Sequence, residues 1–307
     1  MESDFISVII PSYKPNNLVY KAIESALNQS LGRNFYEIIV VLNYEDKKIS
    51  EMENEHLIKV LHVNDLSLSS KYIAALRISH GNILSFLDYD DLFYRNKLEY
   101  VYNSFKNNKN LVYFHNRCTF INDEGNSIDE YYYSPDFNLS SISIKKDIIN
   151  MEYLSKVRAL YDTFFYYISL DSGGEIELSR EFLTYYRFHE STSNTNLRGI
   201  DRWKIKMETY LRYLNSLETM YKFLKTKKSR MLARDYIISL KIELNMLSGL
   251  LNSGIKYDLN YDDVLHWLSV ASYKGNRFHY PFKFIKIFQY KLPLKYNRKV
   301  EDYLLKI

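Results

Sequence analysis

The chain has 307 residues, of which 46% are hydrophobic and 25% are charged, and its formal net charge is +4. These values are typical of soluble globular proteins, so a sizeable core can be buried and disorder is not the default. The length suits an α/β domain of about 200 residues with an appended domain. The single cysteine, Cys118, excludes an intramolecular disulfide, and no stretch reaches the roughly 18 apolar residues of a membrane span. The N-terminus lacks the basic start and long apolar run of a signal peptide, so we expect a cytoplasmic protein.

The chain begins with a β-α-β pattern. Residues 6–11 (ISVIIP) form a continuous apolar run that ends at Pro11, which predicts a strand buried on both faces. A helical spacing of apolar residues follows from Leu18, and residues 37–42 (EIIVVL) predict a second buried strand. This order predicts neighbouring parallel strands joined by a right-handed crossover.

The same alternation continues through the first half of the chain. Further strands are expected at 58–63, 82–87 and 111–121, and helices at 69–79 and 95–106. The polar residues 122–127 (NDEGNS) are typical of a hairpin turn. The expected fold class is therefore α/β, with a mostly parallel, Rossmann-like sheet flanked by helices.

An acidic cluster follows directly on the strand expected at 82–87. Asp88 stands at the strand end, and Asp90 and Asp91 stand in the turn after it. Parallel sheets bind ligands beyond the carboxyl ends of their strands, and carboxylates gathered there repel one another unless a cation lies between them. The sequence therefore predicts a Mg²⁺ or Mn²⁺ site that a phosphate can share. The alternative is that these aspartates cap the following helix.

The C-terminal third has a different pattern. From Asp201 onward the apolar residues follow the spacing of long helices, and no proline stands between Pro135 and Pro281. We therefore expect two domains, residues 1–200 and residues 201–307, and the second should be helical.

Residues 276–307 form a basic, aromatic tail. They hold eight lysines and arginines and two acids, and the lysines alternate with bulky apolar residues. Such a segment suits peripheral contact with the anionic inner face of a membrane. In the alternative, its aromatic residues pack on the helical domain and its lysines face water. Single-stranded nucleic acid also binds such sequences, but no matching fold accompanies the tail, so no nucleic-acid partner is expected.

The order and spacing of these blocks resembles the family 2 glycosyltransferases over about residues 5–200. The resemblance rests on SVIIPSYKPNNLVYKAIESALNQS, EIIVV and HGNILSFLDYDD. It implies a GT-A fold and transfer of a sugar, with inversion, from a nucleotide-diphosphate donor, usually with Mg²⁺ or Mn²⁺. UDP-, GDP- and dTDP-sugars are the expected donors, and a glycan or lipid-linked glycan is the expected acceptor.

The resemblance also implies donor-site residues. Tyr13 matches the residue that stacks on the nucleotide base, with ordinary loop packing as the alternative. Asp88 matches the acid near the ribose and the metal, and Asp90 and Asp91 match the metal and diphosphate ligands. In YYRFHESTSN, Arg187 and His189 match residues near the diphosphate and the metal, and a structural role is the alternative for the histidine.

A further segment, ALYDTFFYYISL, matches the family's catalytic position. The family has a Glu-Asp pair at the start of a helix. In this chain Tyr161 replaces the Glu, and Asp162 matches the Asp. The resemblance therefore implies Asp162 as the base that removes the acceptor's hydroxyl proton. The alternatives are a helix cap at this residue and a base supplied elsewhere, by Asp171, Glu175 or Glu177.

Two blocks depart from the family pattern. Residues 42–44 (LNY) stand where the family has two acids and a glycine, so Asn43 is the residue expected to read the base edge. Residues 71–73 (KYI) replace Ala-Arg-Asn, and Lys71 is the cation left to contact the phosphates. These departures favour an unusual donor.

Three functions remain open from the sequence. The first is the inverting glycosyltransferase, and the second is a catalytically degenerate protein that binds a nucleotide or glycan. The third is a metal-dependent phosphotransferase, whose aspartyl-nucleophile pattern needs Thr where this chain has Leu92. A homodimer is also left open.

Overall fold

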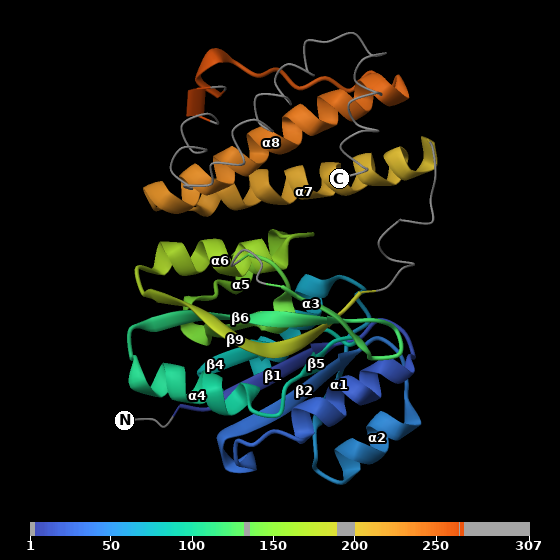
Figure 1. Ribbon diagram of the computed structural model, residues 1–307, viewed down its shortest axis with the longest axis vertical. Helices are drawn as coiled ribbons and strands as arrows, with labels where there is room; N and C mark the ends of the chain where they lie inside the picture. The colour runs from blue at the N-terminus through green and yellow to red at the C-terminus, as the bar shows by residue number, and fades with distance from the viewer. Residues whose placement is uncertain (1–3, 132–135, 189–199, 264, 267–307) are drawn as a thin grey trace. The chain divides into compact units, whose positions relative to one another are not determined.

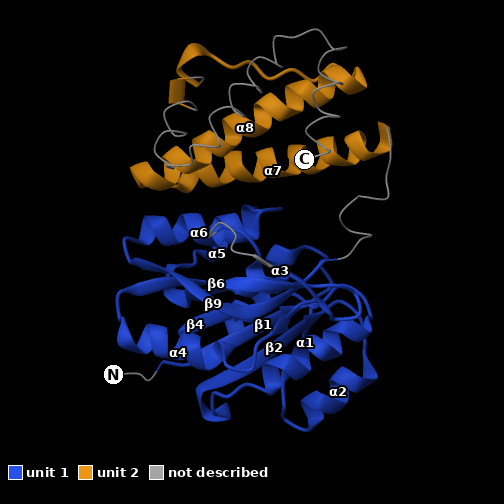
Figure 2. Cartoon of the chain, in the orientation of Figure 1, with its two compact units in different colours: residues 1–193 blue, residues 194–307 orange. Residues whose placement is uncertain are grey.

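The computed structural model describes residues 4–131, 136–188, 200–263 and 265–266. His189 and the basic tail at 276–307 lie outside these residues. The chain divides into two compact units, residues 1–193 and residues 194–307 (Figure 2).

Unit 1 is built on a nine-stranded sheet (Figure 1). Its first half is parallel and has the order β3 (Lys59–His62), β2 (Tyr36–Leu42), β1 (Ile6–Pro11) and β4 (Ile83–Phe86). From β4 the sheet continues through β8 (Ile142–Lys145), β6 (Leu111–Ile121) and β9 (Glu175–Arg187) to β5 (Leu92–Phe93), and β7 (Ser127–Tyr131) pairs with β6.

The second half of the sheet mixes strand directions. β8 runs antiparallel to both β4 and β6, and β5 runs antiparallel to β9, whereas β6 and β9 are parallel. The hairpin expected at 122–127 joins β6 to β7, and a hairpin necessarily reverses the chain. The expected parallel arrangement therefore holds for the half built from β-α-β units, and the remainder of the sheet is mixed.

Helices cover both faces of this sheet (Figure 1). One face carries α1 (Asn17–Leu27), α2 (Lys47–Asn54) and α4 (Lys97–Asn107), and the other carries α3 (Leu68–Ile78), α5 (Met151–Lys156) and α6 (Tyr161–Ser172). Asn16 and Ser67 cap α1 and α3, because their side chains accept the backbone N–H of Leu18 and Ser70. The strands and helices expected from 58 to 121 lie within two residues of their predicted bounds.

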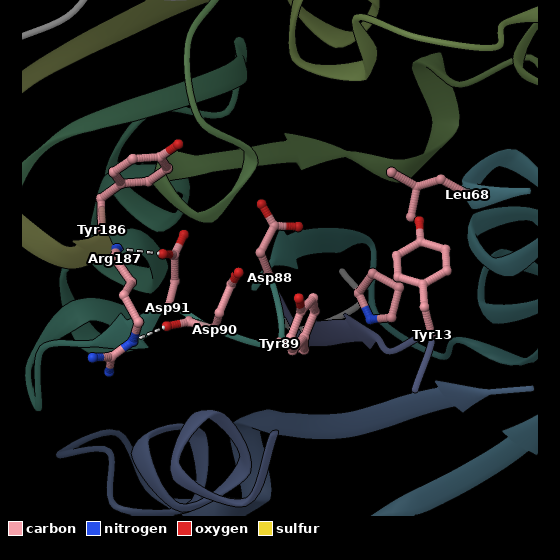
Figure 3. Close-up of a pocket in the computed structure, with 9 residues that line it drawn as sticks. Tyr13, Leu68, Asp88, Tyr89, Asp90, Asp91, Tyr186 and Arg187 are labelled. Atoms are coloured by element: carbon pink, nitrogen blue, oxygen red, sulfur yellow. Dashed lines mark hydrogen bonds between the residues drawn. The ribbon is translucent and has the colours of Figure 1, made fainter. Parts of the chain in front are cut away.

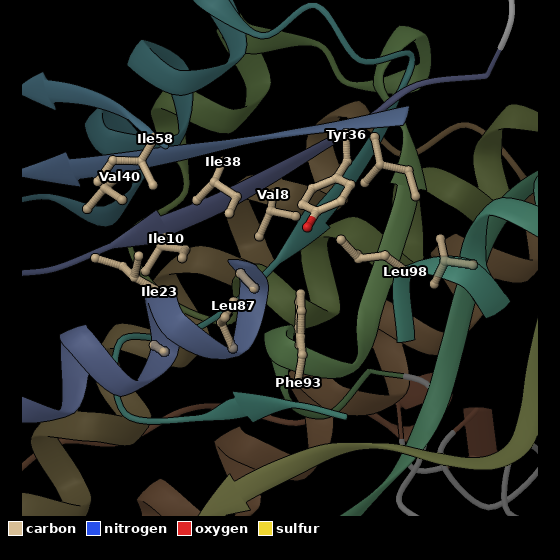
Figure 4. Packing of buried hydrophobic residues seen from close by; sticks show 14 of the residues in the cluster. Val8, Ile10, Ile23, Tyr36, Ile38, Val40, Ile58, Leu87, Phe93 and Leu98 are labelled. Atoms are coloured by element: carbon tan, nitrogen blue, oxygen red, sulfur yellow. The ribbon is translucent and has the colours of Figure 1, made fainter. Parts of the chain in front are cut away.

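The apolar strands are buried on both faces. On one face Val8 and Ile10 of β1 pack with Ile23 of α1 and Leu98 of α4 in a single hydrophobic cluster (Figure 4). On the other face Phe86 of β4 stacks on Phe165 of α6, and the centroids of the two rings are 4.5 Å apart. This double coverage explains why the strands are continuous apolar runs without polar alternation.

Unit 2 contains two long helices, α7 (Ile200–Phe223) and α8 (Lys227–Leu251), which pack against each other. Thr226 caps α8 by accepting the backbone N–H of Ser229, and Lys241 forms an ion pair with Glu218 of α7 at 3.2 Å. Across the described parts of both units, no helix combines the length and the apolar character that crossing a bilayer requires.

Candidate active site

A pocket of about 310 Å³ opens where β1 and β4 end (Figure 3). Its walls come from the loop after β1, the turn after β4 and the end of β9. It is lined by Pro11, Tyr13, Leu68, Asp88, Tyr89, Asp90, Asp91, Tyr186 and Arg187. Five residues predicted from the sequence, drawn from three distant segments, therefore meet in one pocket.

The turn after β4 sets the direction of the aspartates. The backbone N–H of Leu87 donates to the carbonyl of Ile9 at 3.0 Å, so the chain stays paired with β1 up to the strand end. The N–H of Asp91 then donates to the carbonyl of Asp88 at 3.1 Å and closes a turn. In Figure 3 the carboxylates of Asp88, Asp90 and Asp91 all point to the same side of this turn.

The crowding of these carboxylates is electrostatically unfavourable. Burial raises the pKa of Asp88 to about 7, with further contributions from the charges of Asp90 and Asp162. Burial also raises the pKa of Asp91, again with Asp90 and Asp88 adding to the effect. A divalent cation would favour the charged forms of these groups, so the residues present fit one.

The number of protein ligands decides how such a cation would be held. Within the described ranges no three His, Cys, Asp or Glu side chains are grouped so as to hold a metal by themselves. Mg²⁺ commonly takes one or two carboxylates and completes its shell with phosphate oxygens and water. Asp88 and Asp90 would suit that mode, in which the ligand's phosphates share the metal.

Arg187 braces the aspartate turn through its guanidinium. Nε donates to the carbonyl of Asp90 at 2.8 Å, and Nη1 donates to the carbonyls of Asn122 and Asp123 at 2.5 and 2.9 Å. The side chain points away from the three carboxylates in Figure 3. Its predicted contact with a diphosphate stays a prediction, as does the predicted metal contact of His189, which lies outside the described residues.

Tyr13, Asn43 and Lys71 form a second cluster beside the pocket. Lys71 Nζ donates to Asn43 Oδ1 at 2.7 Å and lies 5.1 Å from the centre of the Tyr13 ring. Asn43 Nδ2 in turn donates to the Tyr13 carbonyl at 3.0 Å. Tyr13 is 36% exposed as a residue, which leaves surface for stacking on a base, while Lys71 is buried. The predicted contact of Lys71 with phosphate stays a prediction.

Asp162 lies in the first turn of α6. The residue before the helix, Leu160, has the left-handed angles φ 60° and ψ 48°, and it turns the chain into the helix. Asp162 Oδ1 accepts the N–H of Thr163 at 2.8 Å, and burial raises the pKa of Asp162 to about 7. A carboxylate with this pKa can take up a proton near neutral pH, which suits a general base.

The alternative bases are remote from the pocket. Glu175 begins β9 and Arg187 ends it, so the length of the strand separates Glu175 and Glu177 from the pocket. Asp171 stands nine residues beyond Asp162 on α6, about 13 Å along the helix axis. The geometry therefore favours Asp162 among the candidates.

Several residues of the site carry no strong sequence signal. Tyr89 and Tyr186 line the pocket, and their only signal is their position beside Asp88 and Arg187. Lys97 and Ser140 are buried near the aspartate turn. A lysine on an amphipathic helix is normally read as a solvated residue, so nothing in the sequence marks Lys97.

A family model described as Glycosyl transferase family 2 matches residues 7–162, just over half of the chain. The chain belongs to this family. The match begins in β1 and ends at Asp162, so it includes the pocket loop of Tyr13, the aspartate turn and the candidate base.

Several related proteins align with part of this family 2 chain, and the alignment covers only part of each relative. An uncharacterised glycosyltransferase of Rickettsia bellii is 34% identical over 128 residues, which are 40% of this chain and 18% of that protein. One of Methanocaldococcus jannaschii is 24% identical over 209 residues, 61% of this chain and 72% of that protein. TarP of Staphylococcus aureus, a poly(ribitol-phosphate) β-N-acetylglucosaminyltransferase, is 29% identical over 114 residues, 35% of each chain. The chain spans about a fifth of the length of the relatives from Rickettsia bellii, Rickettsia felis and Rickettsia conorii.

A solved structure shows the same fold. Residues 1–349 of S. aureus TarS in complex with UDP-GlcNAc align with a TM-score of 0.51 and 14% identity, covering 88% of this chain and 92% of that one. At this identity the likeness concerns the fold alone. It confirms the expected GT-A fold with a helical C-terminal region.

Proposed function

We propose that this chain is a metal-dependent, inverting glycosyltransferase that transfers a sugar from a UDP-sugar to a hydroxyl group of a glycan or lipid-linked glycan. The observation that carries the proposal is the meeting of Tyr13, Asp88 and Asp90 in one pocket. The charge of Asp162 contributes to the raised pKa of Asp88. This coupling supports Asp162 as a base that acts beside the donor site.

Related proteins support the choice of donor and acceptor. The TarS structure holds UDP-GlcNAc, and WfgD of Escherichia coli, 27% identical over 126 residues, is named as a UDP-Glc:α-D-GlcNAc-diphosphoundecaprenol β-1,3-glucosyltransferase. A lipid-linked acceptor would also suit peripheral contact of the basic tail at 276–307 with the inner face of a membrane.

Binding of the donor falls to the pocket residues. The exposed ring of Tyr13 stacks on the base, and Asn43, held against it, reads the base edge. Asp88 and Asp90 would hold Mg²⁺ or Mn²⁺, and the bound metal would supply positive charge that stabilises the diphosphate leaving group. Burial of the site strengthens these interactions relative to water.

Transfer requires one proton to move. Asp162 accepts the proton of the acceptor hydroxyl while the oxygen attacks the anomeric carbon from the face opposite the diphosphate. The new carbon–oxygen bond forms as the bond to the diphosphate breaks, so the configuration inverts and the nucleoside diphosphate leaves with the electron pair.

Release of nucleoside diphosphate tests the proposal. A panel of UDP-, GDP- and dTDP-sugars with Mn²⁺ should reveal one donor that the protein hydrolyses slowly in water and transfers faster when acceptor is present. Asp90→Asn should abolish this turnover while the thermal unfolding temperature changes little. A protein that binds a donor but releases no diphosphate would instead be the degenerate binder.

A further inference from the structure

A short 3₁₀ turn, Leu139–Ser141, contacts the aspartate turn from a distant part of the chain. The Ser140 hydroxyl accepts the backbone N–H of Asp88 at 3.0 Å and donates to Asp91 Oδ2 at 2.6 Å. Ser140 itself is fully buried. One hydroxyl thus joins the first and the last aspartate of the turn.

Ser140 is held on all sides by other buried groups. Its carbonyl accepts Lys97 Nζ at 2.7 Å and the Thr184 hydroxyl at 2.9 Å, and its backbone N–H donates to Asn138 Oδ1 at 2.8 Å. Lys97 also donates to Asn116 Oδ1 at 2.6 Å. Burying an ammonium group is costly unless it is hydrogen-bonded, so this network fixes Ser140 in one place.

The same segment also reaches the base. Asn138 has a positive φ of 66°, a conformation that asparagine tolerates better than most residues, and its backbone opposes the rise that burial causes in the pKa of Asp162. The segment from Asn138 to Ser141 therefore lies beside both the aspartate turn and the proposed base.

Both carboxylate oxygens of Asp91 accept a hydrogen bond from the protein. Oδ2 accepts the Ser140 hydroxyl, and Oδ1 accepts the backbone N–H of Arg187 at 2.8 Å. Asp91 is also 1% exposed. Its carboxylate ties the turn after β4 to the end of β9, the position expected of a group that supports ligands.

We propose that Ser140 is a positioning residue that orients Asp88 and Asp90 toward the metal and the donor diphosphate, with Asp91 as its anchor and not as a metal ligand. The inference rests on the proposed function, because it concerns the geometry of the same site. Groups that orient metal ligands typically change metal affinity by about 10- to 100-fold when they are removed.

Ser140→Ala tests the inference against a matched control. Ser143 is also fully buried, and its hydroxyl bonds that of Ser85 at 2.6 Å between β8 and β4. The Mn²⁺ requirement is measured as the Mn²⁺ concentration for half-maximal binding of UDP in titration calorimetry, and again as that for half-maximal donor hydrolysis. Ser140→Ala should raise both concentrations about tenfold or more. Ser143→Ala should lower the unfolding temperature to a similar degree and leave the Mn²⁺ requirement unchanged.

Asp91→Asn provides a second variant in case Ser140→Ala does not fold. Asparagine can still accept the N–H of Arg187 and can donate its amide to the Ser140 hydroxyl, so the turn keeps its two anchors. The Mn²⁺ requirement of this variant should rise by less than in Ser140→Ala, and saturating Mn²⁺ should restore its metal activation, while Asp90→Asn should lose metal activation at any Mn²⁺ concentration.

The outcomes separate the inference from the proposed function. If Ser140→Ala matches Ser143→Ala in its Mn²⁺ requirement, or if Asp91→Asn fails like Asp90→Asn, the positioning role is refuted and the glycosyltransferase stands. If the wild-type protein shows no metal-dependent donor hydrolysis with any sugar nucleotide, both proposals are refuted together.

Discussion

At Asp162, burial decides the pH range in which the residue can act as a base. The pKa of this carboxyl is raised to about 7, and the neutral form cannot accept a proton. Asp88 has a pKa of similar value for a similar reason. A bound cation would lower the pKa of Asp88, so at saturating metal the remaining titration should belong to Asp162.

We therefore expect kcat/KM for transfer to fall about tenfold per pH unit below pH 7 when Mn²⁺ is saturating, because the fraction of ionised Asp162 falls in that proportion. The measurement is a pH–rate profile from pH 5 to 9. A profile that is flat between pH 5 and 7 would assign the proton transfer to another group.

Replacement of the base should separate binding from chemistry. Asp162→Asn should bind the donor with wild-type affinity and slow the transfer by about 10²- to 10⁴-fold, the usual loss for a general base. Asp171→Asn, on the same helix and about 13 Å away, is the control and should transfer normally. Normal transfer by Asp162→Asn would remove the role assigned to it.

The helices and strands of unit 1 rest on close contacts away from the pocket. At the start of β1 and β4, a Cβ on Gly81 would lie 2.5 Å from the backbone nitrogen of Ser7 and 2.8 Å from the carbonyl oxygen of Phe5. Both of these atoms are backbone, so neither can move aside without shifting a central strand.

Gly81→Ala should therefore lower the free energy of unfolding by about 1 to 3 kcal/mol, the usual cost of overpacking. Gly32→Ala is the control, since its nearest neighbour would be a Phe35 ring carbon at an ordinary 3.7 Å. Urea denaturation of both variants measures the difference. Equal stability of the two would show that the strands can separate at Gly81 without cost.

A buried carboxylate between β1 and β2 should make stability depend on pH. Burial alone would raise the pKa of Glu37, but hydrogen bonds from Lys59, Ser7 and His80 outweigh it and lower the pKa to about 2. Lys59 Nζ donates to Glu37 Oε2 at 2.6 Å. A folded-state pKa below the unfolded value of 4.5 means that the stabilisation is complete above that pH and is lost as the pH falls toward 2.

We expect this carboxylate to account for at most about 3 kcal/mol of the stability lost between pH 5 and pH 2, and less if solvent screens the half-exposed Lys59. Urea denaturation of wild type and Glu37→Gln over this range tests it. The variant should be less stable at pH 5 and should lose less stability on acidification. Parallel pH dependence of the two proteins would contradict this assignment.

At the level of elements, the parallel half of the sheet was predictable and the other half was not. β1 and β2 are continuous apolar runs joined by a helical segment, and these features follow from local sequence. β8 is a four-residue strand that pairs with both β4 and β6, so its place depends on contacts far apart in sequence. The roles of Ser140 and Lys97 could not be predicted either, because their contacts also join residues far apart in the sequence.

At the level of the whole molecule, the family match ends at residue 162, inside unit 1. The pocket and the proposed base, Asp162, are both within unit 1, so the candidate site residues that the sequence pattern could identify lie in that unit. Unit 2 is recognisable from sequence only as long amphipathic helices. The spacing of their apolar residues predicts helices but indicates no catalytic or binding role.

Titration calorimetry of UDP with and without Mn²⁺ measures whether donor binding depends on a divalent cation at the aspartate turn. We predict that UDP binds the wild-type protein at least about tenfold more tightly with Mn²⁺, and that Asp90→Asn removes this difference. Equal affinity of the wild-type protein for UDP with and without the metal, or metal-dependent binding that persists in Asp90→Asn, would show that Asp90 does not hold a metal shared with the donor.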